Sequence, residues 1–157
     1  MDLNRIFTVV FLVLLLAWGI WSQLFWEMPV NAKHSFDFWA PRAQNGDAVA
    51  QYNLGVIYDN GLSTVAQNNE AAEHWYLLSA EQGNSDAHFA LGDMYAEGRG
   101  VPQDYVRSHM WWNISAELGD EGAANEKSVL AGKMTASQIV KAEQLAVRCK
   151  QQNFKNC

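Results

Sequence analysis

Histidines and neighbouring carboxylates are the side chains that first suggest chemistry in this sequence. The histidines show no HxxxH or HExxH spacing, so they do not indicate a zinc site. Asp93 and Glu97 stand one helical turn apart, but acid–base catalysis needs a cleft that separates their pKa values. We therefore expect no metal, no cofactor and no catalytic centre. The four histidines are His34, His74, His88 and His109.

Cys149 and Cys157 are the two cysteines of the chain. On one continuous helix their spacing corresponds to about 12 Å of rise, beyond the roughly 7 Å limit between the Cα atoms of a disulfide. The polar residues 151–153 could end the helix and let the tail fold back, and an oxidising compartment would favour the bond. The alternatives are this disulfide or two unlinked thiols at a frayed terminus.

Length, composition and net charge limit the number of domains and the class of partner that this protein can have. The chain has 157 residues, of which 49% are hydrophobic and 18% are charged, as expected for one globular domain. Its formal net charge of −6 argues against binding to nucleic acid, because such proteins need clustered Lys and Arg to displace phosphate counterions. Basic or neutral partners remain open.

Residues 1–30 differ from the rest of the chain. Ile6–Trp26 is an uncharged run of 21 residues, long enough to cross a hydrocarbon layer of about 30 Å as a helix. Tryptophan and phenylalanine gather at its C-terminal end, as at a membrane interface. We expect a transmembrane anchor through residues 6–26. The alternative is a cleaved signal with an apolar core at Ile6–Leu16 and a small-residue site at Ala17–Gly19.

The short N-terminal head favours export of the residues after the apolar run. Arg5 gives a weak positive flank before that run. We expect a single pass through an inner membrane, with residues 31–157 in the periplasm. If the signal is cleaved, the same residues would be secreted or periplasmic.

The rest of the chain repeats itself. GDAVAQYNLGVIYDNG, which starts at Gly46, recurs as GNSDAHFALGDMYAEG from Gly83, and Gly119 comes after a further 36 residues. Such a period indicates stacked helical units, because one helix pair cannot bury its apolar face alone. We expect units at about 46–82 and 83–118.

Each unit is predicted to form two helices. Gly55 and Gly92 lie inside the first helix, where glycine costs about 1 kcal/mol against alanine, so a close approach by a neighbouring helix is expected. The glycines at 61 and 98 are placed to end these helices, and Asn68 and Asp104 to cap the second ones. The repeated residues are Leu54, Gly55, Tyr58 and Trp75 in the first unit and Leu91, Gly92, Tyr95 and Trp111 in the second.

These residues resemble the Sel1-like repeat, a relative of the tetratricopeptide repeat. The pattern AxxxLGxxYxxGxGVxxDxxxAxxWxxxAAxxG is met closely by the second unit, whereas the turn of the first unit lacks the second glycine. Half-units resembling the repeat flank the two full units. A terminal helix over 135–152 is expected to cap the array, with Thr135 as N-cap and Gln138 as its reciprocal partner.

The resemblance implies an all-α, right-handed α-solenoid of antiparallel helix pairs, preceded by the N-terminal hydrophobic helix. The first helices would line a concave face, with aromatic residues at its floor and acids at its sides. Such a groove suits an extended segment that carries Lys or Arg. Alternatively, the aromatics pack in the core and the acids form a solvated face. The implied binding residues are Tyr52, Val56, Asp59, Asp86, Phe89, Asp93 and Glu97.

Two functions are consistent with this interpretation. The first is a membrane-tethered or exported interaction scaffold that binds a protein or peptide on the concave face and is not an enzyme. The alternative is a cell-envelope enzyme, or an enzyme subunit, that acts on cell-wall fragments; the sequence supplies no nucleophile for it.

Overall fold

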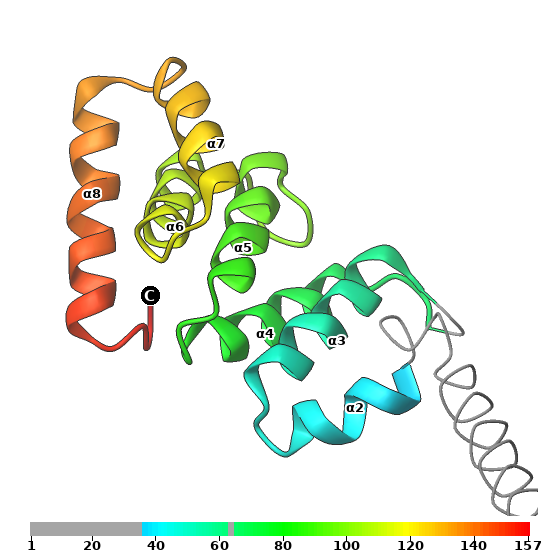
Figure 1. Ribbon diagram of the computed structural model, residues 1–157. Helices are drawn as coiled ribbons and strands as arrows, with labels where there is room; N and C mark the ends of the chain where they lie inside the picture. The colour runs from blue at the N-terminus through cyan, green and yellow to red at the C-terminus, as the bar shows by residue number, and fades with distance from the viewer. Residues whose placement is uncertain (1–35, 63–64) are drawn as a thin grey trace, which may run out of the picture. The chain divides into compact units, whose positions relative to one another are not determined.

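The computed structural model describes residues 36–62 and 65–157, and these residues form helices joined by turns (Figure 1). The hydrophobic helix expected over residues 6–26 lies outside the described residues. Within the described ranges, none of the helices has the length and apolar character needed to cross a membrane. The helices are α2 (Phe36–Gln44), α3 (Ala48–Asn60), α4 (Asn69–Ala80), α5 (Ser85–Glu97), α6 (Tyr105–Glu117), α7 (Glu121–Ala131) and α8 (Ala136–Gln151).

Short polar side chains start these helices. Asn68 and Asp104 cap α4 and α6 as predicted, because their side-chain oxygens accept backbone N–H groups of the first turn. Thr135 and Gln138 form the expected reciprocal capping box at the start of α8. Gly61 and Gly98 end α3 and α5 in the left-handed conformation, as predicted.

The helices pair as antiparallel hairpins. In the first pair, α3 and α4, the Ser79 hydroxyl at the end of α4 donates to the carbonyl of Ala48 at the start of α3, at 2.6 Å. In the second pair, α5 and α6, Ser115 donates to the carbonyl of Ser85 in the same way, at 2.9 Å. α2 packs on α3, α4 on α5, and both α7 and α8 on α6. The predicted all-α stack of helix pairs is therefore confirmed.

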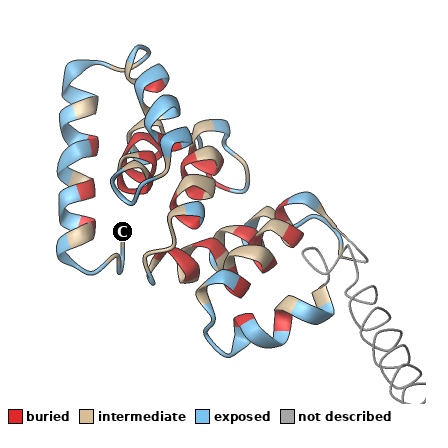
Figure 2. Ribbon diagram, viewed as in Figure 1, coloured by how far each residue is buried: buried red, intermediate tan, exposed pale blue. Residues whose placement is uncertain are grey.

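Aromatic rings fill the space left by the helical glycines. A Cβ atom at Gly55 would lie 2.6 Å from the Tyr76 ring, and one at Gly92 would lie 2.3 Å from the Trp112 ring. The predicted close approach of a neighbouring helix is confirmed in both hairpins. The sequence pattern predicts that the aromatic wedge is the repeated tryptophan, Trp75 or Trp111, but the rings that face the glycines are Tyr76 and Trp112, one position later. Buried residues concentrate between the paired helices (Figure 2).

Pro41 lies inside the first flanking helix. Proline lacks the backbone N–H, so the sequence predicts that Pro41 starts or kinks a helix. α2 begins at Phe36 and runs through Pro41 to Gln44, so Pro41 does not start it. α7 occupies Glu121–Ala131, where a degenerate first helix is expected, and α8 buries Ala142 and Ala146 completely.

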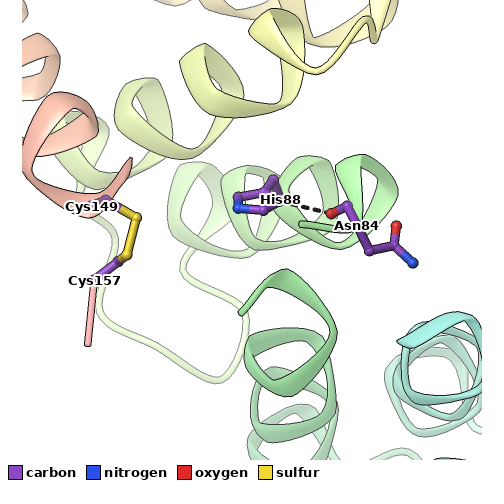
Figure 3. Close-up of a disulfide and its surroundings, with 4 residues drawn as sticks. All are labelled: Asn84, His88, Cys149 and Cys157. Atoms are coloured by element: carbon purple, nitrogen blue, oxygen red, sulfur yellow. Dashed lines mark hydrogen bonds between the residues drawn. A yellow bond between two sulfur atoms is a disulfide. The ribbon is translucent and has the colours of Figure 1, made fainter. Parts of the chain in front are cut away.

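The chain reverses after α8 and is joined to that helix by a disulfide. Asn153, Phe154 and Asn156 have positive φ angles of 52°, 61° and 56° and turn the chain back, so that Cys157 bonds to Cys149 with 5.1 Å between their Cα atoms (Figure 3). The Phe154 ring lies 5.1 Å from the imidazole of His88, centroid to centroid. His88 is fully buried, and its Nδ1–H donates to the Asn84 carbonyl at 2.7 Å (Figure 3).

Candidate binding site

Three of the predicted binding residues meet at one pocket. Phe89, Asp93 and Glu97 succeed one another along α5, and the pocket of about 370 Å³ that they line is closed by α6 and by α7 with the turn after it. The spacing of these three residues places them on one side of the helix. The full lining is Phe89, Asp93, Ala96, Glu97, Tyr105, Trp112, Glu126, Val129, Leu130 and Lys133.

Trp112 forms a buried wall of this pocket. Its indole lies 6.3 Å from the Phe89 ring, centroid to centroid, with 37° between the ring planes. Its Nε1–H donates to Oδ1 of Asp93 at 3.1 Å. Because Gly92 has no side chain, the indole can lie against α5 and reach the carboxylate one residue further along. The ring and the acid are therefore positioned together.

The pocket is electrically negative at Asp93. Burial raises the pKa of this carboxyl to about 6, because a charged carboxylate loses hydration there. The hydrogen bond from Trp112 and the charge of Arg99 lower the pKa, whereas Glu97 and Glu126 raise it. At neutral pH Asp93 is therefore mostly a carboxylate that is only partly compensated by its surroundings.

Tyr52 and Val56 take part in packing. The Tyr52 ring lies 5.8 Å from the Tyr76 ring, and both Tyr52 and Val56 are partly buried against the main core. The pKa of Tyr52 is raised, first by burial and then by the carboxylates of Asp86, Asp93 and Asp120. Asp86 itself is exposed. Tyr52 is therefore a packing residue that also feels the charge of three carboxylates.

Asp59 is buried and does not line an open groove. The sequence placed its carboxylate among the displayed acids, but it is buried, pairs with Arg99 and accepts a hydrogen bond from the Tyr76 hydroxyl at 3.5 Å. Arg99 also binds Glu97 at 2.6 Å. Arg99 comes just after α5 in the second unit and pairs with Asp59 of the first unit, so it links the two repeats. Its charge also neutralises part of the predicted negative charge.

A second pocket, of about 440 Å³, lies beside the turn between α5 and α6. The Tyr95 hydroxyl in its lining accepts from Arg107 at 3.0 Å and donates to Glu73 at 3.1 Å. The hydrogen-bonding groups of Tyr95, Arg107 and Glu73 are therefore paired with one another. The first pocket offers a carboxylate that is less fully compensated, and we take it as the candidate site.

Sequence reasoning missed much of the far side of the pocket. Trp112 gave a signal, since it stands beside the repeated tryptophan, but the sequence did not show which of the two rings faces α5. Glu126 and Lys133 belong to the degenerate unit, where no repeat pattern assigns positions. In the residues that the structure describes, no three metal-ligating side chains gather into a possible metal site.

Comparison with known proteins gives matches to one kind of repeat. Residues 48–84 and 85–120 match the family model described as Sel1 repeat. A protective antigen of uropathogenic Escherichia coli with an SLR fold superposes with a TM-score of 0.70 at 28% identity, covering 78% of this chain and 27% of that one. A Sel1 repeat protein from Oxalobacter formigenes superposes with a TM-score of 0.55 at 31% identity, covering 59% and 38%.

Curated relatives match over parts of much longer proteins. A chitin synthase regulator of Malassezia restricta is 33% identical over 103 residues, which is 64% of this chain and 7% of that protein. A component of an ERAD-associated E3 ubiquitin-protein ligase of Arabidopsis thaliana is 36% identical over 59 residues, which is 38% of this chain and 9% of that protein. The chain thus spans less than a tenth of the length of either relative.

Proposed function

We propose that this chain, which belongs to the Sel1-like repeat family, acts as a scaffold that binds a segment of a partner protein without transforming it. The observation that carries the proposal is the pocket where α5, α6 and α7 meet, with its aromatic wall and its poorly compensated carboxylate. The relatives support the same class of function, since one is described as a regulator and another as a ligase component.

The charge on this side of the molecule favours a basic segment. Asp86 and Glu126 are exposed and Asp93 is half-buried, so their carboxylates would attract Lys and Arg during encounter. Phe89 and Tyr105 are partly exposed in the same region and would supply contact area. An extended segment would meet the acids and the rings together.

We further propose that the scaffold is tethered to, or exported across, an inner membrane through residues 6–26. The uncharged 21-residue run supports this, and so does the Cys149–Cys157 bond, because disulfides persist mainly in oxidising compartments such as the periplasm. A fusion of alkaline phosphatase after residue 157 tests the topology. Active phosphatase is expected, and an inactive fusion protein in the cytoplasm would contradict export.

A peptide library tests the binding function. The full-length chain, held in detergent micelles, is used to select displayed random dodecapeptides, and selected peptides are titrated against variants. Phe89→Asp should abolish binding because it places a charge against the Trp112 ring, whereas Val140→Asp on the exposed face of α8 should not. Glu126→Lys is a second pocket variant, chosen because the exposed residue can change without disturbing the core.

Circular dichroism of each variant shows whether its helices are retained. Peptides that lose affinity for Glu126→Lys and Phe89→Asp support the groove. The proposal fails if no peptide is enriched, or if folded pocket variants bind as well as Val140→Asp.

A further inference from the structure

We infer that the pocket formed by α5, α6 and α7 is a subsite for one cationic side chain, Lys or Arg, of the bound segment. The inference rests on the proposed function and narrows it, from a groove that favours basic partners to one position at which a cation is required. Three features of the pocket carry it: its rings, its carboxylates and the position of its one lining cation.

The rings provide the surface on which a cation can stack. Phe89 on α5 and Tyr105 and Trp112 on α6 all line the pocket. The negative face of an aromatic ring attracts an ammonium or guanidinium group within about 6 Å of its centroid. Trp112 is the strongest of the three in this respect, and it is held in place by Gly92 behind it and by its bond to Asp93.

The carboxylates provide the charge that a cation would neutralise. Trp112 occupies Oδ1 of Asp93, while no donor among residues 36–62 and 65–157 is found at Oδ2. Glu126 stands on the opposite wall, on α7, and is exposed. Glu97 is already paired with Arg99 and contributes less. A guanidinium or ammonium in the pocket would meet two carboxylates, Asp93 and Glu126, that form no ion pair within the described part of the chain.

Other occupants fit the pocket less well. An apolar side chain would bury Asp93 further without compensating its charge, which costs free energy. An acidic side chain would meet Asp93, Glu97 and Glu126 and be repelled. Lys133 is the one cation that the described residues contribute to the lining. It is exposed after the end of α7, and its flexible stem can carry the ammonium into solvent when a ligand enters.

Titration of the indole N–H signal of Trp112 tests the inference directly. The ¹⁵N-labelled full-length chain is titrated with acetylated, amidated pentapeptides that differ at the central residue: arginine, lysine, norleucine or glutamate. The signal is assigned with Trp112→Phe. Arginine and lysine peptides should shift the signal, with arginine at least as tight, whereas norleucine should bind about tenfold more weakly and glutamate should cause no shift.

Two variants with the same change of charge locate the contact. Asp93→Asn should weaken binding of the arginine peptide by about tenfold, because the pocket loses its buried carboxylate. Glu143→Gln removes the same charge from an exposed position of α8 outside the pocket, so its effect should stay within about twofold. Equal losses in the two variants would mean that the peptide responds to the general negative charge of the protein, and would overturn the inference.

Lys133→Gln tests whether the side chain bound in the pocket is positively or negatively charged. A cationic occupant is repelled by Lys133, so the arginine peptide should bind about two- to threefold more tightly to the variant. A weaker interaction would point to an anionic occupant and reject the subsite.

The pH dependence should agree with these variants. Binding of the arginine peptide requires the Asp93 carboxylate, whose pKa is about 6, so affinity should fall about tenfold between pH 7.5 and pH 5. In Asp93→Asn, which keeps Glu97 and Glu126, this fall should largely disappear.

Different results would reject the scaffold function and the cationic subsite. Selected dodecapeptides that need Phe89 but carry no recurrent Lys or Arg would leave the scaffold function intact and reject the cationic subsite. An absence of any peptide that binds the groove would reject both.

Discussion

The repeated glycine and the ring that faces it are the residues on which each hairpin depends. Gly55 meets Tyr76 and Gly92 meets Trp112 at distances that no side chain would allow. Sequence reasoning recognised the close approach, because a glycine inside a helix is unfavourable without such a reason. It chose the wrong ring, the repeated tryptophan, because two aromatic residues stand next to one another at 75–76 and again at 111–112, and helix packing decides which of them faces the glycine.

Gly92→Ala should destabilise the protein although alanine is the better helix former. The helix would gain about 1 kcal/mol, but the new Cβ would lie 2.3 Å from the Trp112 ring, and overpacking of this kind costs about 1–3 kcal/mol. We expect a net loss of up to about 2 kcal/mol in urea unfolding monitored by circular dichroism. At Gly122, on α7, a Cβ would lie 3.1 Å from Oδ1 of the Asp120 side chain and 3.7 Å from the Phe89 ring, so Gly122→Ala should cost less stability than Gly92→Ala. A stabilising Gly92→Ala would contradict this account of the glycine.

His88 should make stability depend on pH. Burial lowers its pKa, so the folded protein keeps the imidazole neutral while the unfolded chain takes up a proton near pH 6.5. The free energy of unfolding contributed by His88 is thus fully present above that pH and decreases as pH falls toward 5. His109 acts in the same direction, mainly through burial, whereas Asp93, with its raised pKa, acts in the opposite one.

Substitution isolates the contribution of His88. His88→Asn keeps a side-chain N–H for the Asn84 carbonyl and removes the titration, so the slope of unfolding free energy against pH between 5 and 7 should be smaller than in the parent. The double variant with His109→Asn should have the smallest slope. An unchanged slope in His88→Asn would show that the imidazole can be protonated without loss of the fold.

At the scale of the helix, the ends were the most predictable features. Asn68, Asp104 and Thr135 were identified as caps because a short polar side chain before a helical pattern satisfies free N–H groups locally. The course of α2 through Pro41 was not predictable in this way. Its packing against α3 is tertiary, and tertiary contacts can override a local preference.

The C-terminal end of α8 gives a prediction for the disulfide. The Cys149–Cys157 bond closes a short loop. By limiting the conformations of the opened tail, it should stabilise the folded tail by about 2–3 kcal/mol. Reduction with dithiothreitol should therefore speed amide hydrogen exchange in residues 150–157 by about 30- to 150-fold, while α3 to α6 keep their protection.

Phe154→Ala separates the covalent bond from the ring contact. It keeps the disulfide but removes the packing on His88, so it should accelerate exchange in the same segment less than reduction does. If reduction leaves exchange of the tail unchanged, packing of Phe154 alone holds the segment in place.

At the scale of the whole array, Arg99 joins the two units. It reaches from the turn after α5 to Asp59 on α3, and the two residues are 40 positions apart. The pairing was not predictable, since the repeat pattern describes each unit separately and assigns no role to this arginine. The candidate site was partly predictable for a similar reason. Residues of α5 came from the repeat pattern, whereas those of α7 came from a unit in which the pattern is lost.

A double-mutant cycle with Arg99→Met and Asp59→Asn should show a coupling free energy of about 1–2 kcal/mol, because the carboxylate is mostly shielded from water. The exposed pair Arg107–Asp104, with 3.8 Å between its charged atoms, should show less than about 0.5 kcal/mol. Urea unfolding of the four proteins in each cycle measures both values. Equal coupling in the two pairs would mean that the link between the repeats contributes no more than a surface ion pair.

The two hairpins are built alike, yet their parts cannot be exchanged one at a time. In the first, the ring at 76 reaches an acid at 59; in the second, the ring at 112 reaches an acid at 93. A tryptophan moved to position 76 would find Val56 where its own acid should stand, and a tyrosine moved to 112 would find Ala96. Gene duplication can copy such a hairpin whole, but later drift must change ring and acid together around the unchanged glycine, so a chimera of such repeats should inherit ring and acid from the same parent.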